Sequence, residues 1–465
     1  MHERLTVLDA SLLDLDNPRA PLHTGGVSVF RGAIPFWDVH EALQARLDRV
    51  PLARRRVREV PFGGRPVWVD DPDFDLSYHL RHAALPQPGD DGQLGEFVSR
   101  LIARPLDRQR PLWELYVIEG LEGGRTALFR KVHLAMAGGD HGDPFAALLD
   151  DEADVGAEAA PTSWEPEEEP SVVELAADAA RERAAEATRA GRGLADVATH
   201  PARAAGAATA AVGSVAGIAA RLAQAAPRSP LNRRLTSHRR FATTQLDLDA
   251  MRSVRTSLGG SVNDAVVAVC ADAVGRLLRW RGHETKDLDL RVMVPVRVHG
   301  DAGGGELDPA STIGEGAVGV IAPLPVMEMD PVARLYRVMG ELAGLKESRQ
   351  AVAADHLVRL AGYGPATLHA TAARLVIGEQ RYNFALSNAP GPQTPRWLAG
   401  VPLEASYPFI PLSGDAALSI AVTSYTGVMC VGLLGEWRAM PDLPRLATFI
   451  GESADDLCEA AQVGR

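Results

Sequence analysis

The residues best suited to acid–base chemistry gather in one short stretch, residues 131–145, which read KVHLAMAGGDHGDPF. His133 ends a run of strand-forming residues, and His141 follows two glycines and Asp140. A histidine titrates near neutral pH, so either side chain is a candidate general base if it reaches a substrate hydroxyl. Each also has a structural interpretation, which we prefer: a buried, hydrogen-bonded histidine for His133, and an exposed loop histidine for His141, which Asp140 could orient.

Motifs of several other enzyme classes are absent from the sequence. It contains no GxSxG elbow, no GxxxxGK[ST] loop, no HExxH and no repeated Cys/His pairs at metal-ligand spacing. The glycines of residues 301–308 follow no clear strand and open no helix, which predicts a flexible loop. We therefore expect neither a serine hydrolase, an NTPase, a zinc protease nor a dinucleotide enzyme, and no metal site.

The composition of the sequence limits the expected binding partners of the protein and its expected cellular compartment. The 465 residues carry a net charge of −12, and no basic face dominates, so nucleic acid is not an expected partner. The cysteines, Cys270, Cys430 and Cys458, lie far apart, which predicts small buried thiols in a reducing compartment. The first residues lack the apolar core of a secretory signal, and no apolar run reaches the roughly 18–20 residues that span a bilayer. These features predict a cytoplasmic protein, either soluble or peripheral to a membrane.

The length predicts two domains of about 150–220 residues each. Composition divides the chain into an N-terminal domain (1–150), a connector (151–240) and a C-terminal domain (241–465). The connector begins with an acidic, proline-containing stretch and continues as an alanine-rich helix former. Both outer regions alternate strand and helix patterns, so the predicted fold class is α/β (α+β) with mixed sheets.

Particular elements position the candidate histidines. Residues 25–30, 66–70, 113–120 and 125–135 have the β-like composition of strands, and residues 36–50 have that of a helix. The run 125–135 leads directly into His133. We therefore expect this histidine at the end of a strand in the N-terminal sheet.

The C-terminal region contains the clearest helix, residues 261–282, whose apolar residues recur every three to four positions and whose start Ser261 or Asn263 could cap. Alternating valines predict a strand over 291–299, which Pro295 should restrict to an edge or bulged position. Residues 382–389 predict a strand that ends in a Pro-Gly-Pro turn, and residues 419–435 a hairpin with Gly427 in its turn.

Several of these segments together resemble the bacterial wax ester synthase/diacylglycerol acyltransferase family. The opening LTVLDASLLDLDNPRAPLHTGGVSVF resembles the N-terminal strand and turn of that family, and Pro111, Leu112 and Trp113 match its Pro-Leu-Trp motif. Asn263 and Asp264 match its Asn-Asp motif. SNAPGP (387–392) and GVPLEASYPFIPL (400–412) match its late segments. The similarity covers nearly the whole chain, with its motifs in the family's order.

The resemblance implies two chloramphenicol-acetyltransferase-like domains with a tunnel between them. In that tunnel an acyl-CoA substrate would meet a lipid alcohol, either a diacylglycerol or a fatty alcohol, with no cofactor. Ligand sites favour domain interfaces, which agrees with the two-domain prediction. The family's active-site motif is His-His-x-x-x-Asp-Gly, in which the second histidine is the general base.

This motif is degenerate here. Aligned residue by residue, His133 is the first histidine, Leu134 stands in place of the base, and Gly138 stands in place of the aspartate. Leucine cannot accept a proton. General-base catalysis supplies roughly 10²–10⁴ in rate, which is about 3–5 kcal/mol of barrier. We therefore expect acyl transfer to be weak, rewired through another base such as His141, or absent.

Each remaining motif allows two interpretations. Trp113 either packs structurally around the tunnel or contacts substrate. Asn263 and Asp264 either cap a helix or contribute to the active site. Ser387 and Asn388 either fix the turn after their strand or line the substrate site.

Two connector segments also allow two interpretations. The cluster of basic side chains near the end of the connector is either a solvated linker end or a site for CoA phosphates or anionic headgroups; it comprises Arg233, Arg234, His238, Arg239 and Arg240. The uncharged segment 204–220 could rest at a membrane or lipid-droplet surface.

Two functions follow from the sequence. One is an O-acyltransferase that uses acyl-CoA and a lipid alcohol at a reduced or rewired rate. The other is a non-catalytic homologue that binds acyl-CoA or lipid, or that partners an active paralogue.

Overall fold

The structure is a computed structural model. It describes residues 3–61, 64–137, 164–181, 226–298, 307–308, 317–347 and 382–462, together with residues 184 and 188. His141, Gly138, the segment 204–220 and most of the glycine-rich stretch 301–308 lie outside the described residues, so the predictions about them stay predictions.

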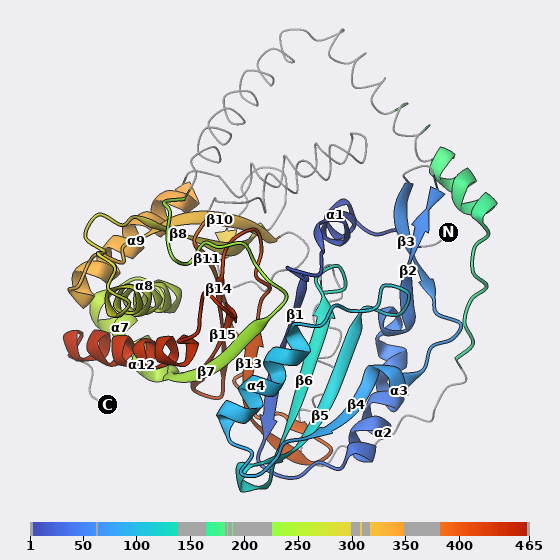
Figure 1. Cartoon of the computed structure of the whole chain (residues 1–465), viewed down its shortest axis with the longest axis horizontal. Helices are drawn as coiled ribbons and strands as arrows, with labels where there is room; N and C mark the ends of the chain where they lie inside the picture. Colours follow the sequence, from blue (N-terminus) through green and yellow to red (C-terminus); the bar gives the residue numbers. More distant parts are fainter. Residues whose placement is uncertain are drawn as a thin grey trace.

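One mixed sheet organises the N-terminal half, and its strands run in the order β12-β13-β1-β6-β5-β4 (Figure 1). Its strands are β1 (His23–Phe30), β4 (Leu80–Ala84), β5 (Trp113–Leu121), β6 (Arg125–His133), β12 (Trp397–Leu398) and β13 (Val401–Phe409). The accompanying helices are α1 (Val7–Leu15), α2 (Phe36–Arg46), α3 (Leu76–His79) and α4 (Asp91–Ile102). The short 3-10 turns are η1 (Leu47–Arg49), η2 (Pro51–Arg54) and η4 (Glu122–Gly124).

A second mixed sheet organises the C-terminal half, in the order β10-β8-β11-β14-β15-β7, with β9 paired to β8. Its strands are β7 (Arg239–Asp247), β8 (Leu290–Val298), β9 (Leu307–Asp308), β10 (Ala317–Leu324), β11 (Phe384–Ala389), β14 (Leu418–Tyr425) and β15 (Val428–Glu436). The helices α7 (Leu248–Leu258), α8 (Val262–Trp280), α9 (Pro331–Glu347) and α12 (Leu443–Ala460) pack together beside this sheet (Figure 1). The predicted helix, hairpin and late strand of this half are therefore confirmed.

A strand from the C-terminal half of the chain completes the N-terminal sheet. β13 belongs to the C-terminal half of the chain, yet it pairs antiparallel with β1, from Gly25 opposite Phe409 to Phe30 opposite Leu403. Helix α4 adds a second link, because the Ser99 hydroxyl accepts the Phe241 N–H at 2.8 Å. The core beneath both elements is continuous, so the seam between the halves is closely packed.

The prediction that Pro295 confines its strand to an edge is wrong. β8 lies between β10 and β11, so it is an interior strand. The register shows how the proline is accommodated: β11 pairs with Val292 and Met293, and β9 pairs with Arg297 and Val298. Pro295 falls between these two partners, where the missing N–H interrupts no ladder on that side.

Within the predicted connector, residues 164–181 contact a separate ribbon made of β2 (Arg55–Val60) and β3 (Gly64–Asp70). Glu169 pairs with Arg56 at 2.8 Å and with Arg58 at 3.0 Å. Leu175 and Ala179 pack against the valines of the ribbon. The acidic stretch is therefore held, at this end, by both charge and apolar contact.

Candidate functional site

His133 is the last residue of β6, and its side chain is buried. Its Nδ1 accepts the N–H of Ala135 at 3.1 Å, which fixes the proton on Nε2 in the neutral ring. Nε2 lies 3.9 Å from an Asp16 carboxylate oxygen and has no hydrogen-bond partner in the described part of the chain. Burial lowers the pKa of His133 to about 4, so the ring is neutral at pH 7.

Leu134, which the resemblance predicts to replace the family's base, belongs to a small apolar cluster. It packs with Leu12 of α1 and with Leu22, while Leu8 and Leu15 border them. The backbone is fixed as well, because the Leu134 N–H donates to the Leu22 carbonyl at 2.9 Å. The side chain at this position therefore contributes packing and no proton-transfer group.

A second buried histidine, His23, lies opposite His133. No spacing pattern in the sequence marks it as a candidate. His23 is directly across from His133 in the β1–β6 ladder, and the two ring centroids are 5.9 Å apart at an interplanar angle of 67°. Neither ring nitrogen of His23 has a hydrogen-bond partner among the residues that the structure describes. A buried polar group without a partner costs about 1–3 kcal/mol. His23 lies two residues before the strand predicted over 25–30, and the sequence does not say what that strand pairs with.

Trp113 is a structural residue in this fold. Its side chain is fully buried, its Nε1–H donates to the Ala53 carbonyl at 2.8 Å, and its ring stacks on His79 with a centroid separation of 4.4 Å. These contacts favour the packing interpretation over substrate contact, because the indole already has its polar partner.

The Asn-Asp motif and the late Ser-Asn motif are brought together in the C-terminal half. Ser261 and Asp264 form a reciprocal capping box at the start of α8. The next contact crosses to β11, where the Asn388 amide donates to the Asn263 side-chain oxygen at 3.2 Å. Ser387 is buried beside it in the same strand. Ser261 and Asp264 form the helix cap, whereas Asn263 links α8 to β11.

The predicted basic cluster does not act as a single cationic surface. Arg239 is buried and donates to the carbonyl oxygens of Thr236, His238 and Arg19, and burial lowers its pKa to about 10. Arg240 lies over the Trp437 ring at 3.6 Å. Arg239 is therefore unsuited to phosphate binding, because its donors are already used.

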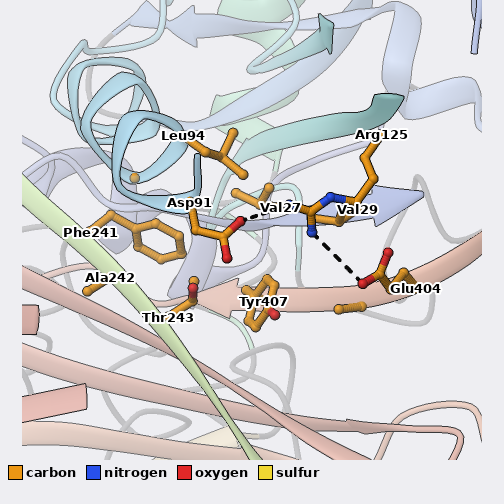
Figure 2. A pocket seen from close by; sticks show the side chains of 12 residues that line it. Val27, Val29, Asp91, Leu94, Arg125, Phe241, Ala242, Thr243, Glu404 and Tyr407 are labelled. Carbon is orange, nitrogen blue, oxygen red and sulfur yellow. Dashed lines mark hydrogen bonds and ion pairs between the residues drawn. The ribbon is translucent and has the colours of Figure 1, made fainter. Parts of the chain in front are cut away.

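A cavity at the seam between the halves lies away from His133. It has a volume of about 30 Å³ and is lined by α4, β1, β7 and β13 (Figure 2). Arg125, at the opposite end of β6 from His133, pairs there with Asp91 at 3.3 Å and with Glu404 at 3.9 Å (Figure 2). A space of this size holds water at most. It belongs to the packing of the seam.

Comparison with known proteins identifies the family. The model of the wax ester synthase/diacylglycerol acyltransferase catalytic domain matches residues 5–266, and that of the family's C-terminal domain matches residues 314–457. The chain therefore belongs to the wax ester synthase/diacylglycerol acyltransferase family of acyltransferases. Its fold is the expected pair of chloramphenicol-acetyltransferase-like domains.

Individual relatives extend over almost the whole chain. A probable diacylglycerol O-acyltransferase of Mycobacterium tuberculosis is 31% identical, covering 98% of each chain. The O-acyltransferase WSD of Acinetobacter baylyi is 28% identical, covering 96% of this chain and 94% of its own.

Solved structures agree with this assignment. The wax ester synthase/diacylglycerol acyltransferase of Marinobacter aquaeolei VT8 superposes with a TM-score of 0.68 at 26% identity, covering 99% of this chain and all of its own. A condensation domain of the calcium-dependent antibiotic synthetase has a TM-score of 0.54 at 16% identity, covering 99% of this chain and 96% of its own, and shows the shared fold.

Proposed function

We propose that this protein binds acyl-CoA and a lipid alcohol, and that it forms the ester far more slowly than members of its family that retain the motif base. The observation that carries the proposal is the packing of Leu134 among Leu12 and Leu22. A leucine cluster occupies the position from which the base would accept the hydroxyl proton. The rate lost is the roughly 10²–10⁴ that a general base supplies.

Substrate binding is proposed because the motifs that carry the scaffold are intact. Asn263 and Asn388 hold α8 to β11, and Trp113 has its full set of buried contacts. A tunnel depends on such packing more than on one histidine. Acyl-CoA and diacylglycerol or a fatty alcohol are the proposed ligands because relatives covering the whole chain bear acyltransferase names.

The test is a thermal-shift titration paired with a turnover assay. Long-chain acyl-CoA at about 100 times its Kd should stabilise the folded protein by about 2.7 kcal/mol, seen as a higher Tm. With diacylglycerol or hexadecanol added, release of free CoA and formation of ester should run at least about 100-fold below a family member with histidine and aspartate at the two motif positions. Short-chain acetyl-CoA is the matched ligand control and should shift Tm less.

Two results would refute this function. An unchanged Tm at saturating acyl-CoA removes the binding claim. Turnover equal to that of the relative that retains the motif would show that Leu134 does not lower the rate of ester formation. Complete absence of ester, with the Tm shift retained, favours the second function, a non-catalytic acyl-CoA-binding homologue or partner of an active paralogue.

Association with a membrane or lipid inclusion belongs to the same proposal. No helix in the described part of the chain is long and apolar enough to cross a bilayer. Contact with lipid would therefore be peripheral if it uses the described helices. Flotation with diacylglycerol-containing liposomes measures it directly, and protein that stays at the bottom of the gradient would contradict it.

A further inference from the structure

Two buried histidines share one face of the N-terminal sheet. His23 in β1 and His133 in β6 are direct partners in an antiparallel ladder, so their side chains point to the same side. Both are almost completely buried. Their neighbours along the chain, Leu22 and Leu134, are joined by the backbone hydrogen bond at 2.9 Å. The histidine pair therefore adjoins the position that holds the family's base.

Three ring nitrogens of this pair have no hydrogen-bond partner among the described residues: both nitrogens of His23 and Nε2 of His133. Buried polar atoms in folded proteins almost always have a partner, so a group of three requires an explanation. The two ring centroids are 5.9 Å apart, so the two imidazoles are near neighbours on this face of the sheet. No three His, Cys, Asp or Glu residues within the described ranges are grouped for a metal ion, so an oxygen fits better than a cation.

We propose that His23 and His133 form a site for one hydroxyl oxygen, and that residual acyl transfer uses this pair in place of the missing base. The proposal rests on the proposed function, because it assigns the proton acceptor for the slow reaction. It brings in His23, which the family's motif does not contain.

The step balances without any further reactant. The unprotonated ring nitrogen of His23 accepts the proton of the acceptor hydroxyl as the hydroxyl oxygen bonds to the thioester carbonyl carbon, while the Nε2–H of His133 donates to that oxygen. The carbon–sulfur bond then breaks, and the CoA thiolate takes the proton back from the imidazolium. The products are the ester and free CoA, and the pair returns to its neutral form.

Burial, together with nearby cations, keeps the pair neutral before the reaction. The facing groups are Asp16 after α1, Arg108 before β5, Lys131 in β6 and Arg239 in β7. Burial is the largest cause of the lowered pKa of His23, and the cations add to it. Asp16 is already paired with Arg108 at 3.0 Å, which weakens its pull on the proton. A neutral ring is the form that can accept a proton.

Glutamine variants test the pair. His23→Gln and His133→Gln should each lower the residual release of CoA by about 100-fold or more, while the Tm shift caused by acyl-CoA is retained. The double variant should lose little beyond the worse single variant, because the two rings act as one unit. The matched control is His82→Gln, since His82 is a half-exposed histidine paired with Glu119 at 3.0 Å, and its turnover should be unchanged.

Wild-type turnover in both single variants would overturn the inference. So would a wild-type protein that binds acyl-CoA but forms no ester, and that result leaves the binding part of the proposed function standing. Where the variants fail to fold, a crystal structure of the wild-type protein with 1-dodecanol decides. A hydroxyl oxygen within hydrogen-bonding distance of a His23 or His133 ring nitrogen supports the site, and an alcohol bound elsewhere overturns it.

Discussion

The contact between Asn263 and Asn388 differs in kind from the region around His133 and Leu134. At the first, the polar side chains have partners: Asp264 completes the helix cap with Ser261, and the Asn388 amide reaches Asn263. At the second, ring nitrogens lack partners among the described residues, and Leu134, which the resemblance predicts to replace the base, packs among leucines. The two regions therefore differ in whether their buried polar groups are paired.

The comparison distinguishes two roles of motif residues, one in holding the fold together and one in the reaction. The retained residues hold one element against another, so their loss would cost folding free energy. At Leu134 the proposed loss is of a group that accepts a proton, and the leucine there packs among other leucines. On this proposal, a chain keeps its family's fold and the order of its motifs after losing the side chain that reacts.

The largest expected effect comes from restoring the motif. Leu134→His with Gly138→Asp should raise acyl transfer by up to roughly 10²–10⁴, because it returns a general base. Placing a polar ring in the leucine cluster should cost about 1–3 kcal/mol of stability, which opposes part of the gain. The measurement is release of CoA with long-chain acyl-CoA and diacylglycerol.

Two single changes serve as controls for this rescue. Leu134→His alone should gain less, since an unsupported imidazole can adopt the wrong tautomer. Leu134→Met keeps the volume and the apolar character, so it should gain nothing. A folded double variant with wild-type turnover would mean that the region differs from active relatives in more than its motif.

An intermediate effect should appear in the acid stability of the histidine region. His133 has a pKa of about 4 in the folded protein against about 6.5 when unfolded, so below pH 6.5 the unfolded chain binds more protons. The part of the free energy of unfolding that depends on the titration of His133 is fully present above about pH 6.5 and is lost as the pH falls toward 4. At about 1.36 kcal/mol per pKa unit it amounts to roughly 3 kcal/mol.

Urea unfolding at pH 7.5, 6.0 and 5.0 measures this loss. His133→Gln should flatten the dependence, and His82→Gln should leave it as in the wild type. An equal slope in His133→Gln and wild type would show that His133 is not the titrating group.

The smallest effect concerns the retained motif. Ser261→Ala removes the side-chain acceptor at the start of α8 and should lower the free energy of unfolding by about 1 kcal/mol. Binding of acyl-CoA, followed by its Tm shift, should be unchanged. Ser257→Ala, near the end of the preceding helix α7, is the matched serine control and should change stability by less than about 0.5 kcal/mol. A larger loss of binding than of stability in Ser261→Ala would assign this helix start to the ligand site instead.

Local patterns were enough to predict much of this fold. The apolar spacing from Val266 to Leu278 predicted α8, and Ser261 caps it as expected, but the helix is buried on nearly every side rather than along one stripe. Thr426 and Gly427 both adopt positive φ in the β14–β15 turn, as the position of Gly427 indicated. That Leu134 replaces the family's base rests on the sequence alone and stays a prediction.

Features that depend on distant residues could not be predicted. Pro295 appeared to exclude an interior strand because its sequence does not reveal that β11 and β9 pair on either side of it. His23 carries no spacing signal, and it becomes a candidate only through its register with His133. Both facts depend on strand pairing between segments far apart in the chain.

The crossing of β13 has a consequence for biosynthesis. When the first half of the chain leaves the ribosome, β1 has β6 on one side and an unpaired edge of eight residues on the other, because its second partner is still to be made. An open edge of this length is a template for pairing with other chains. In the complete chain, β13 covers the open edge of β1. We therefore expect either half expressed alone to aggregate under conditions in which the whole chain folds.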